Sequence, residues 1–385
     1  MSIENGRPLN AGRRQALGWM AACAATAGWP MNALANNPLV VGQVAPFSGP
    51  QAVSGKAIHA GIKLYFDAVN ARGGINGRPL KLVTRDDGQK PEETVRLTRE
   101  LIAAESPVAL MGTIGTANLE ALHKDGVLQS ARLSLVGALS GAHSVVQASN
   151  IHIVKASYHD EVAHLFKQLA ANGLKRVGLL FQDDTFGRDV IAGAEAAAQK
   201  HGIELAVRSG YPRNTVAVEK AVSEIAAANV QVVLLASTTA PAISFVRQYT
   251  AAGGKGTIYG LSVIDTDVVL GELGQDRARG YAFSVVTPLA QRTTLPVVRE
   301  YLQLKAASKD ADIRSRSLEG FIAAKALVRV LQGLGDPTPS KLTDALNAAR
   351  SVDVGGFVLD FSDDKRAASR YVDFAMFGAG GRVFQ

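Results

Sequence analysis

The sequence predicts an α/β protein with two lobes, each built on a doubly wound parallel sheet. Three features indicate this: the strands are continuously apolar, amphipathic helical stretches separate them, and the alternation restarts near Ile151. Apolar strands that alternate with helices are typical of parallel sheets covered on both faces. A chain of 385 residues that is 47% hydrophobic and 19% charged is large enough to bury two such cores.

The first 35 residues are expected to be an export signal that is not part of the fold. Arg13 and Arg14 precede an uncharged, Ala-rich run, and small residues at 33–35 provide a cleavage site. The arginine pair resembles a twin-arginine signal, and the general export route is the alternative. The expected location is therefore the periplasm. Residues 20–23 also resemble a lipoprotein cleavage box, so anchoring at Cys23 is a further alternative.

The first lobe is expected to begin at residue 36 and to alternate strands with helices. Apolar runs predict strands at 38–47, 80–87, 107–112 and 132–139. Amphipathic stretches predict helices at 57–71, 91–104 and 116–128. The helix at 91–104 starts with proline and acidic residues, which favour a helix N-terminus.

The second lobe follows the same pattern up to about Gly280. Strands are predicted at 175–183, 203–211, 230–236 and 255–261, and helices at 160–173, 186–202, 218–230 and 240–254. A strand at 281–288 then precedes helices at 295–308, 317–334 and 340–350, and strands at 355–362 and 370–378 close the chain. The late helices predict a return to the first lobe. That lobe would hold residues 36–155 and 287–359, and the second lobe 156–286 and 360–385.

The sequence contains no motif for catalysis, for a cofactor or for a metal. A dinucleotide-binding G-x-G-x-x-G, a phosphate-binding glycine loop, a G-x-S-x-G elbow and an H-E-x-x-H pair are all missing. The net charge of +7 is spread without a block of Lys and Arg, which disfavours nucleic acid as a partner. Asp86 and Asp87 end a predicted strand without a third ligand nearby. We interpret them as bracing their loop or capping the next helix, so the chain is predicted not to be an enzyme.

The order of these segments resembles the periplasmic solute-binding proteins of ABC transporters, of the leucine/isoleucine/valine-binding type. The matching pieces are FSGP at 47–50 with Gly55, NARGGING at 70–77, Asp86-Asp87, Gly112 with Thr116, FQDD at 181–184 with Phe186-Gly187, and SLEGF at 317–321. The resemblance implies a periplasmic binding protein type I fold, with three crossovers near Lys155, Val286 and Leu359. It also implies closure on the ligand by hinge bending and docking of the closed form on an inner-membrane permease with separate ATPase subunits. A monomer is expected because the receptor must open and close, and no cofactor is expected.

Two loops of the first lobe are expected to hold a ligand carboxylate. Thr116 begins a predicted helix, so its hydroxyl and the neighbouring backbone N–H groups can face an anion. Ala138 and Ser140 follow the fourth strand and offer a second backbone group and a second hydroxyl. The corresponding loops of the family hold the carboxylate without a fixed positive charge. Alternatively, Thr116 is only an N-cap and Ser140 only a turn residue.

Three residues of the second lobe are further candidates for ligand contact. Tyr158 follows the first crossover, and Phe186 matches an aromatic residue of the family that closes over the ligand. Both aromatic side chains can equally pack within the lobe. Thr238 follows its strand at the place of another pocket residue of the family.

Ser262 departs from the family, because amino-acid binders place an acidic residue near this position to pair with the ligand's ammonium group. A buried ammonium without a carboxylate partner is costly. Either Asp265 or Glu319 supplies that charge, or the ligand has no ammonium. An acid such as Glu319 is also favourable simply because it lies in the first turn of a helix.

The predicted function is an exported receptor that binds a small carboxylate-bearing solute and feeds an ABC importer. A branched-chain or other apolar amino acid is the first ligand class, and an amine-free organic or aromatic acid is the second. A ligand sensor on the same fold is an alternative that no DNA-binding or transmembrane segment supports. An exported hydrolase would need a nucleophile elbow, which the sequence lacks.

Overall fold

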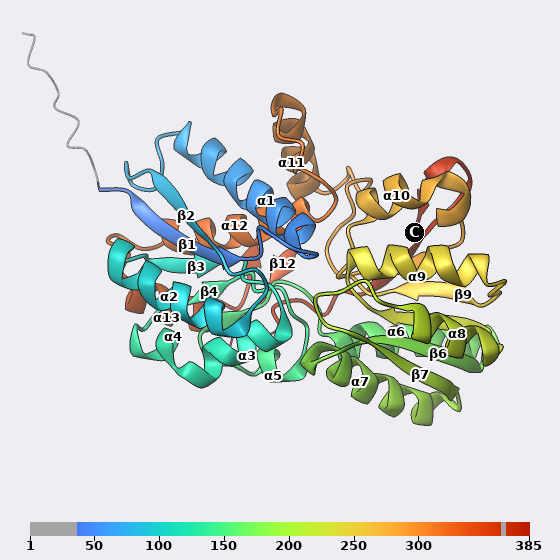
Figure 1. Cartoon of the computed structure of the whole chain (residues 1–385). Helices are drawn as coiled ribbons and strands as arrows, with labels where there is room; N and C mark the ends of the chain where they lie inside the picture. Colours follow the sequence, from blue (N-terminus) through green and yellow to red (C-terminus); the bar gives the residue numbers. More distant parts are fainter. Residues whose placement is uncertain (1–36, 363–366) are drawn as a thin grey trace, which may run out of the picture. The chain divides into compact units, whose positions relative to one another are not determined.

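The computed structural model describes residues 37–362 and 367–385, and Pro38–Gln385 forms one compact unit. The export signal expected at residues 1–35 lies outside the described residues. Figure 1 shows two main sheets with helices packed on them. We call the five-stranded sheet with its helices the first lobe, and the seven-stranded sheet with its helices the second lobe.

The sheet of the first lobe is parallel throughout, with the strand order β2-β1-β3-β4-β5. Its strands are β1 (Leu39–Ala45), β2 (Leu80–Asp86), β3 (Ala109–Met111), β4 (Leu135–Val136) and β5 (Ile151–His152). The intervening helices are α1 (Ala52–Asn70), α2 (Pro91–Glu105), α3 (Thr116–Asp125), α4 (Val127–Ser130) and α5 (His143–Val146). The single helix predicted at 116–128 is wrong, because Gly126 takes a left-handed conformation with φ of 75° and ends α3 there.

The sheet of the second lobe has the order β14-β13-β10-β9-β8-β6-β7. Its strands are β6 (Arg176–Asp183), β7 (Glu204–Pro212), β8 (Val232–Ala236), β9 (Thr257–Gly260), β10 (Ala282–Val285), β13 (Asp373–Phe377) and β14 (Val383–Phe384). Its helices are α6 (Tyr158–Ala171), α7 (Thr185–His201), α8 (Glu219–Ala227), α9 (Thr239–Ala251) and α10 (Thr266–Ala278). The strands β13 and β14 are antiparallel to their neighbours, so this sheet is mixed and not purely parallel.

The segment between β10 and β13 packs on the first lobe. It contains α11 (Pro296–Ala307), α12 (Ser317–Gln332), α13 (Pro339–Ala348) and a small antiparallel pair, β11 (Val352–Asp353) and β12 (Val358–Leu359). The short helix η1 (Ala379–Gly381) lies between β13 and β14. The helices α1 and α12 approach so closely that a Cβ atom on Gly61 would lie 1.8 Å from the carbonyl oxygen of Ser317.

The chain passes between the two lobes three times: after β5, after β10 and after β12. Lys155 and Val286 lie in the first two connections, and Leu359 ends the strand before the third. The first and third connections run side by side, because Ile153 and Ala367 form a parallel β-bridge. The residue boundaries predicted for the two lobes stay a prediction.

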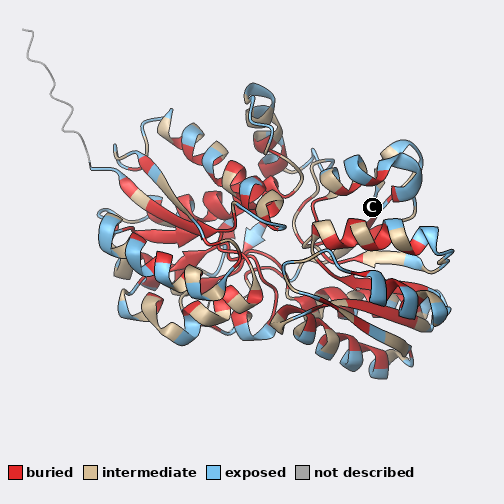
Figure 2. Cartoon of the chain, in the orientation of Figure 1, coloured by how far each residue is buried: buried red, intermediate tan, exposed pale blue. Residues whose placement is uncertain are grey.

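Buried residues follow the strands of both sheets and the inner faces of their helices (Figure 2). All five residues of β8 are buried because helices cover both of its faces. One hydrophobic cluster continues from the first lobe, through Val145 and Tyr158, to Phe186 of the second. No helix within 37–362 or 367–385 combines the length and the apolar composition that a membrane span requires.

Candidate functional site

A cavity of about 40 Å³ lies where loops from the two lobes meet. Its lining comes from the segments at the ends of β1, β2, β3 and β4 of the first lobe and of β6, β8 and β9 of the second, together with Tyr158 at the start of α6 and Arg316 just before α12. The lining residues are Gln51, Ser54, Gln89, Ile114, Gly115, Thr116, Leu139, Tyr158, Gln182, Asp184, Phe186, Thr238, Val263 and Arg316. The carboxyl ends of parallel strands share one edge of a sheet, so the fold itself gathers these loops. We call this space the central cavity.

The first-lobe wall of the central cavity is built around the N-terminus of α3. Thr116 is the first residue of this helix, and no side chain within the described residues caps its leading N–H groups. The hydroxyl of Thr116 is 2.9 Å from that of Ser140, which also accepts a hydrogen bond of 3.1 Å from the Ala142 N–H. The N-cap Gly115 has a φ of 103°, and a Cβ atom there would lie 2.1 Å from Nε2 of Gln89.

The structure therefore brings Thr116 into the cavity and places Ser140 behind it, as its hydrogen-bond partner. Ala138 is buried and is not among the lining residues. Hydroxyls and helix N–H groups in this arrangement can donate hydrogen bonds to an anionic oxygen. Ligand contact by these three residues stays a prediction.

Two aromatic rings form the apolar wall of the cavity. The ring centroids of Tyr158 and Phe186 are 5.0 Å apart, and both side chains are buried. Ser157 and Asp160 form a capping box that starts α6 and so places Tyr158. Burial raises the pKa of Tyr158 well above its ordinary value, so the phenol stays neutral. The two rings therefore offer an uncharged, apolar surface to a bound molecule.

Asp184 sets the position of Phe186 and belongs to the same cavity. Its Oδ1 accepts hydrogen bonds from the N–H groups of Phe186 at 3.0 Å and Gly187 at 3.2 Å. Its Oδ2 accepts one of 2.6 Å from Gln182 and lies 3.2 Å from Nε of Arg213. Burial raises the pKa of Asp184, and these donors and Arg213 act in the opposite direction.

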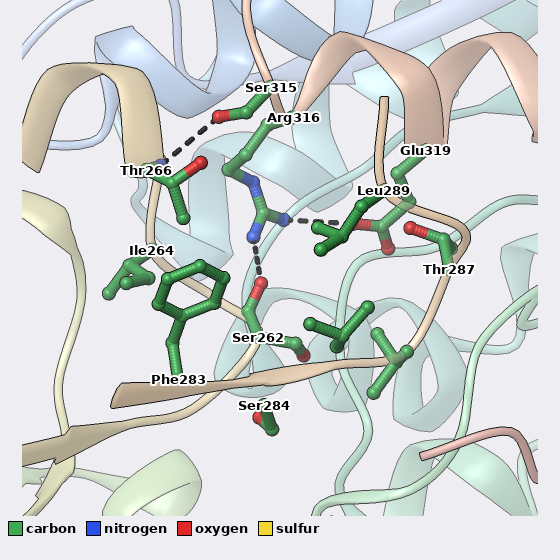
Figure 3. Close-up of a pocket in the computed structure, with 12 residues that line it drawn as sticks. Ser262, Ile264, Thr266, Phe283, Ser284, Thr287, Leu289, Ser315, Arg316 and Glu319 are labelled. Carbon is green, nitrogen blue, oxygen red and sulfur yellow. Dashed lines mark hydrogen bonds and ion pairs between the residues drawn. The ribbon is translucent and has the colours of Figure 1, made fainter. Parts of the chain in front are cut away.

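A second cavity, of about 60 Å³, adjoins the first, because Arg316 lines both. Ser262 and Glu319 line this adjacent cavity and not the central one. Figure 3 shows Arg316 reaching between them: its Nη1 donates to the Ser262 carbonyl at 2.5 Å, and its Nη2 to Oε2 of Glu319 at 3.2 Å. Of the eight predicted site residues, Thr116, Tyr158, Phe186 and Thr238 thus share one cavity, whereas Ser262 and Glu319 share its neighbour.

Buried charges surround Ser262. The ammonium of Lys155 is 3.3 Å from the Ser262 hydroxyl and 3.8 Å from Oε1 of Glu319. Glu161 accepts hydrogen bonds from the Ser262 N–H at 2.9 Å and hydroxyl at 2.8 Å, and from the Ser284 hydroxyl. Burial raises the pKa of Glu161, and Lys155 and these donors partly oppose that effect. Lys155 and Glu161 are both completely buried.

Both acids that the sequence offers as ammonium partners have interactions within the chain, but one oxygen of each, Oδ2 of Asp265 and Oε1 of Glu319, has no hydrogen-bond partner among the described residues. Asp265 is the N-cap of α10 and accepts hydrogen bonds from the N–H groups of Asp267 and Val268 and from the Ser315 hydroxyl. Glu319 lies between the ammonium of Lys155 and the guanidinium of Arg316.

The two aspartates that end β2 act as braces for the loop that follows. Asp86 accepts a hydrogen bond of 3.0 Å from the Gly88 N–H, and Asp87 accepts one of 2.9 Å from the Gln89 N–H. The interpretation as loop braces is confirmed. The capping alternative is wrong, because Lys90 is the N-cap of α2 and no side chain caps it in the described chain.

Sequence reasoning missed several lining residues, above all Arg316, Gln89 and Asp184. Arg316 directly precedes the SLEGF segment, which is itself one of the matching pieces. Gln89 follows the second strand at the edge where Thr116 follows the third. The position of each residue along the chain could therefore have suggested it as a lining residue, but the direction of its side chain could not be read from the sequence.

The chain is similar to known proteins over nearly its whole described length. A family model described as periplasmic binding protein matches residues 38–382. The crystal structure of a substrate-binding periplasmic protein from Ralstonia solanacearum has 42% sequence identity and a TM-score of 0.87, and the match covers 90% of this chain and 99% of that one.

Two more distant proteins are described by their ligands. The structure of a possible leucine/isoleucine/valine-binding protein from Rhodopirellula baltica has 26% identity and a TM-score of 0.85, covering 91% of this chain and 97% of that one. The Leu/Ile/Val-binding protein homolog 8 of Brucella suis is 26% identical over 348 residues, which is 86% of this chain and 83% of that protein.

Proposed function

This chain belongs to the periplasmic binding protein family, and we propose that it is the extracytoplasmic substrate-binding component of an ABC importer. Its ligand is a small solute with a carboxylate, held in the central cavity. Delivery to a membrane permease with ATPase subunits, and function as a monomer, are parts of the same proposal. Related proteins are described as Leu/Ile/Val-binding, so branched-chain amino acids and acids of similar shape are the first ligands to test.

The observation that carries the proposal is the hydroxyl pair of Thr116 and Ser140 at the uncapped N-terminus of α3. A carboxylate at this place accepts hydrogen bonds from the helix N–H groups and gains from the positive end of the helix dipole. The apolar body of the ligand then lies against the ring pair of Tyr158 and Phe186. The two lobes contribute opposite walls, so ligand contacts favour the closed arrangement of the lobes.

Isothermal titration calorimetry with ligand-stripped protein tests this proposal. Each candidate acid is compared with its own primary amide, which keeps the body and removes the negative charge. The acids are expected to bind and the amides to bind at least about tenfold more weakly, the effect of losing one charged hydrogen bond. Equal binding of an acid and its amide would contradict the carboxylate site.

The variant Thr116→Val keeps the size of the side chain and removes its hydroxyl. We expect it to weaken binding of the acid about tenfold. The matched control is Thr250→Val, at an exposed position of α9, which should leave affinity unchanged. Uptake of the radiolabelled acid by cells that carry wild-type protein, the Thr116→Val variant or neither then tests delivery to a permease.

A further inference from the structure

We propose that the ligand carries no ammonium group and instead presents a hydrogen-bond acceptor to Arg316. The ligand class is a small acid with a carbonyl or hydroxyl oxygen beside its carboxylate, such as a 2-oxo or 2-hydroxy acid. This inference rests on the proposed function and narrows its substrate class. It follows from the partners of the charged side chains around the two cavities.

The carboxylates that line the cavities are poor partners for a ligand ammonium, and Asp265, whose Oδ2 has no partner in the described chain, lines neither cavity. Among the described residues that line them, the acids are Asp184 and Glu319. Asp184 is surrounded by three hydrogen-bond donors and the guanidinium of Arg213, which uses the lone pairs of a carboxylate. Oε1 of Glu319 has no hydrogen bond, but the ammonium of Lys155 lies 3.8 Å away. A second ammonium there would be repelled by the first.

Arg316, in contrast, has a side-chain N–H group that donates no hydrogen bond within the described residues. Its side chain is 5% exposed, it lines both cavities, and it uses Nη1 on Ser262 and Nη2 on Glu319. Its Nε has no partner in the described part of the chain. A buried donor without an acceptor is costly, so an acceptor supplied by a ligand would remove that cost.

Gln89 offers one unused acceptor, because its Oε1 has no partner within the described residues. A neutral amide oxygen does not provide the charge that a buried ammonium needs. It can accept a hydrogen bond from a hydroxyl, which is why 2-hydroxy acids belong to the proposed class.

The test compares acids that share a carbon skeleton. Leucine is paired with 4-methyl-2-oxopentanoate, valine with 3-methyl-2-oxobutanoate, and phenylalanine with phenylpyruvate, all titrated by calorimetry into ligand-stripped protein. The oxo acid of at least one pair is expected to bind at least about tenfold more tightly than its amino acid, the effect of one hydrogen bond to a charged group.

A variant then assigns the effect to Arg316. Arg316→Met should remove the preference for the oxo acid, and Arg316→Lys should keep part of it. Arg314→Met, two residues away, removes a partly exposed pair with Asp312 and should leave the preference unchanged. Thermal melting shows whether each variant folds. If Arg316→Met does not fold, the comparison of wild type with Arg316→Lys still tests the role of Arg316.

The outcomes separate this inference from the proposed function. Tighter binding of the amino acids would overturn the inference and leave the carboxylate receptor intact. A preference for the oxo acid that survives in Arg316→Lys and Arg316→Met would overturn the role of Arg316. Binding of no acid in any pair would overturn the inference and the proposed function together.

Discussion

Nη2 of Arg213, just after β7 in the second lobe, donates a hydrogen bond of 2.6 Å to Oδ1 of Asn118, in α3 of the first lobe. The same atom donates one of 2.8 Å to the Gln89 carbonyl. The Asn118 amide is held in this orientation because its Nδ2 donates to the Thr94 hydroxyl, which in turn donates to Asp87. The loop brace at Asp87 therefore also positions a contact between the lobes.

Arg213 is expected to hold the closed arrangement of the lobes. Arg213→Met removes both interlobe hydrogen bonds together with the ion pair to Asp184 inside the second lobe, so we expect the ligand to dissociate at least about tenfold faster, the effect of one charged hydrogen bond. Stopped-flow fluorescence measures the dissociation rate. The control is Arg208→Met, in β7, which removes an exposed pair with Glu195 and should change nothing. Equal dissociation rates for the two variants would contradict this role.

His152 is expected to make the protein less stable in acid. Burial lowers the pKa of His152 from 6.5 to about 4. Below pH 6.5 the unfolded chain therefore binds a proton that the folded chain does not. The stabilising contribution is complete above pH 6.5 and falls by about 3 kcal/mol as the pH drops to 4.

The measurement for His152 is urea denaturation at several pH values between 7 and 4. Buried acids with raised pKa, such as Glu161, change stability in the opposite direction over this range. The informative quantity is therefore the difference in the free energy of unfolding between wild type and His152→Gln. This difference should shrink as the pH falls. His123→Gln, at an exposed histidine, is the control. A difference that is independent of pH would contradict the prediction.

The ion pair of Lys155 and Glu319 is expected to show strong coupling in a double-mutant cycle. Lys155→Met leaves buried carboxylates without their cation and should lower the free energy of unfolding by about 3 kcal/mol. The double variant Lys155→Met/Glu319→Gln should lose less than the sum of the single variants. Lys63→Met removes an exposed pair with Asp67 and should cost at most about 0.5 kcal/mol. Additive losses in the cycle would show that the two charges do not interact.

Gly61 is expected to be essential for the contact of α1 with α12. An alanine there would place Cβ 1.8 Å from the Ser317 carbonyl oxygen, so the helices must separate, at a cost of about 1–3 kcal/mol. Gly271→Ala is the matched control, because nothing lies within 4 Å of its added Cβ in α10. Chemical denaturation compares them, and equal stability of the two variants would contradict the expected clash.

The family and the fold class could be predicted from the sequence, and both predictions are confirmed by the family match and the similar structures. Four of the predicted site residues line the central cavity together: Thr116, Tyr158, Phe186 and Thr238. Each follows a strand or begins a helix, and parallel strands bring such positions to one edge. Helix α10 was not predicted, and its break at Gly274 interrupts the apolar periodicity that would have revealed it.

Local patterns along the chain are enough to predict alternating strands and helices, because burial of apolar side chains repeats at short range and with a definite period. Such local patterns do not reveal which charged residues pair with one another. The cluster of Lys155, Glu161, Ser262, Arg316 and Glu319 comes from three separate segments, at 155–161, 262 and 316–319, which meet only in the folded chain. The chemistry of this cavity depends on which buried charges neutralise each other, and that is a property of distances between segments far apart in the chain.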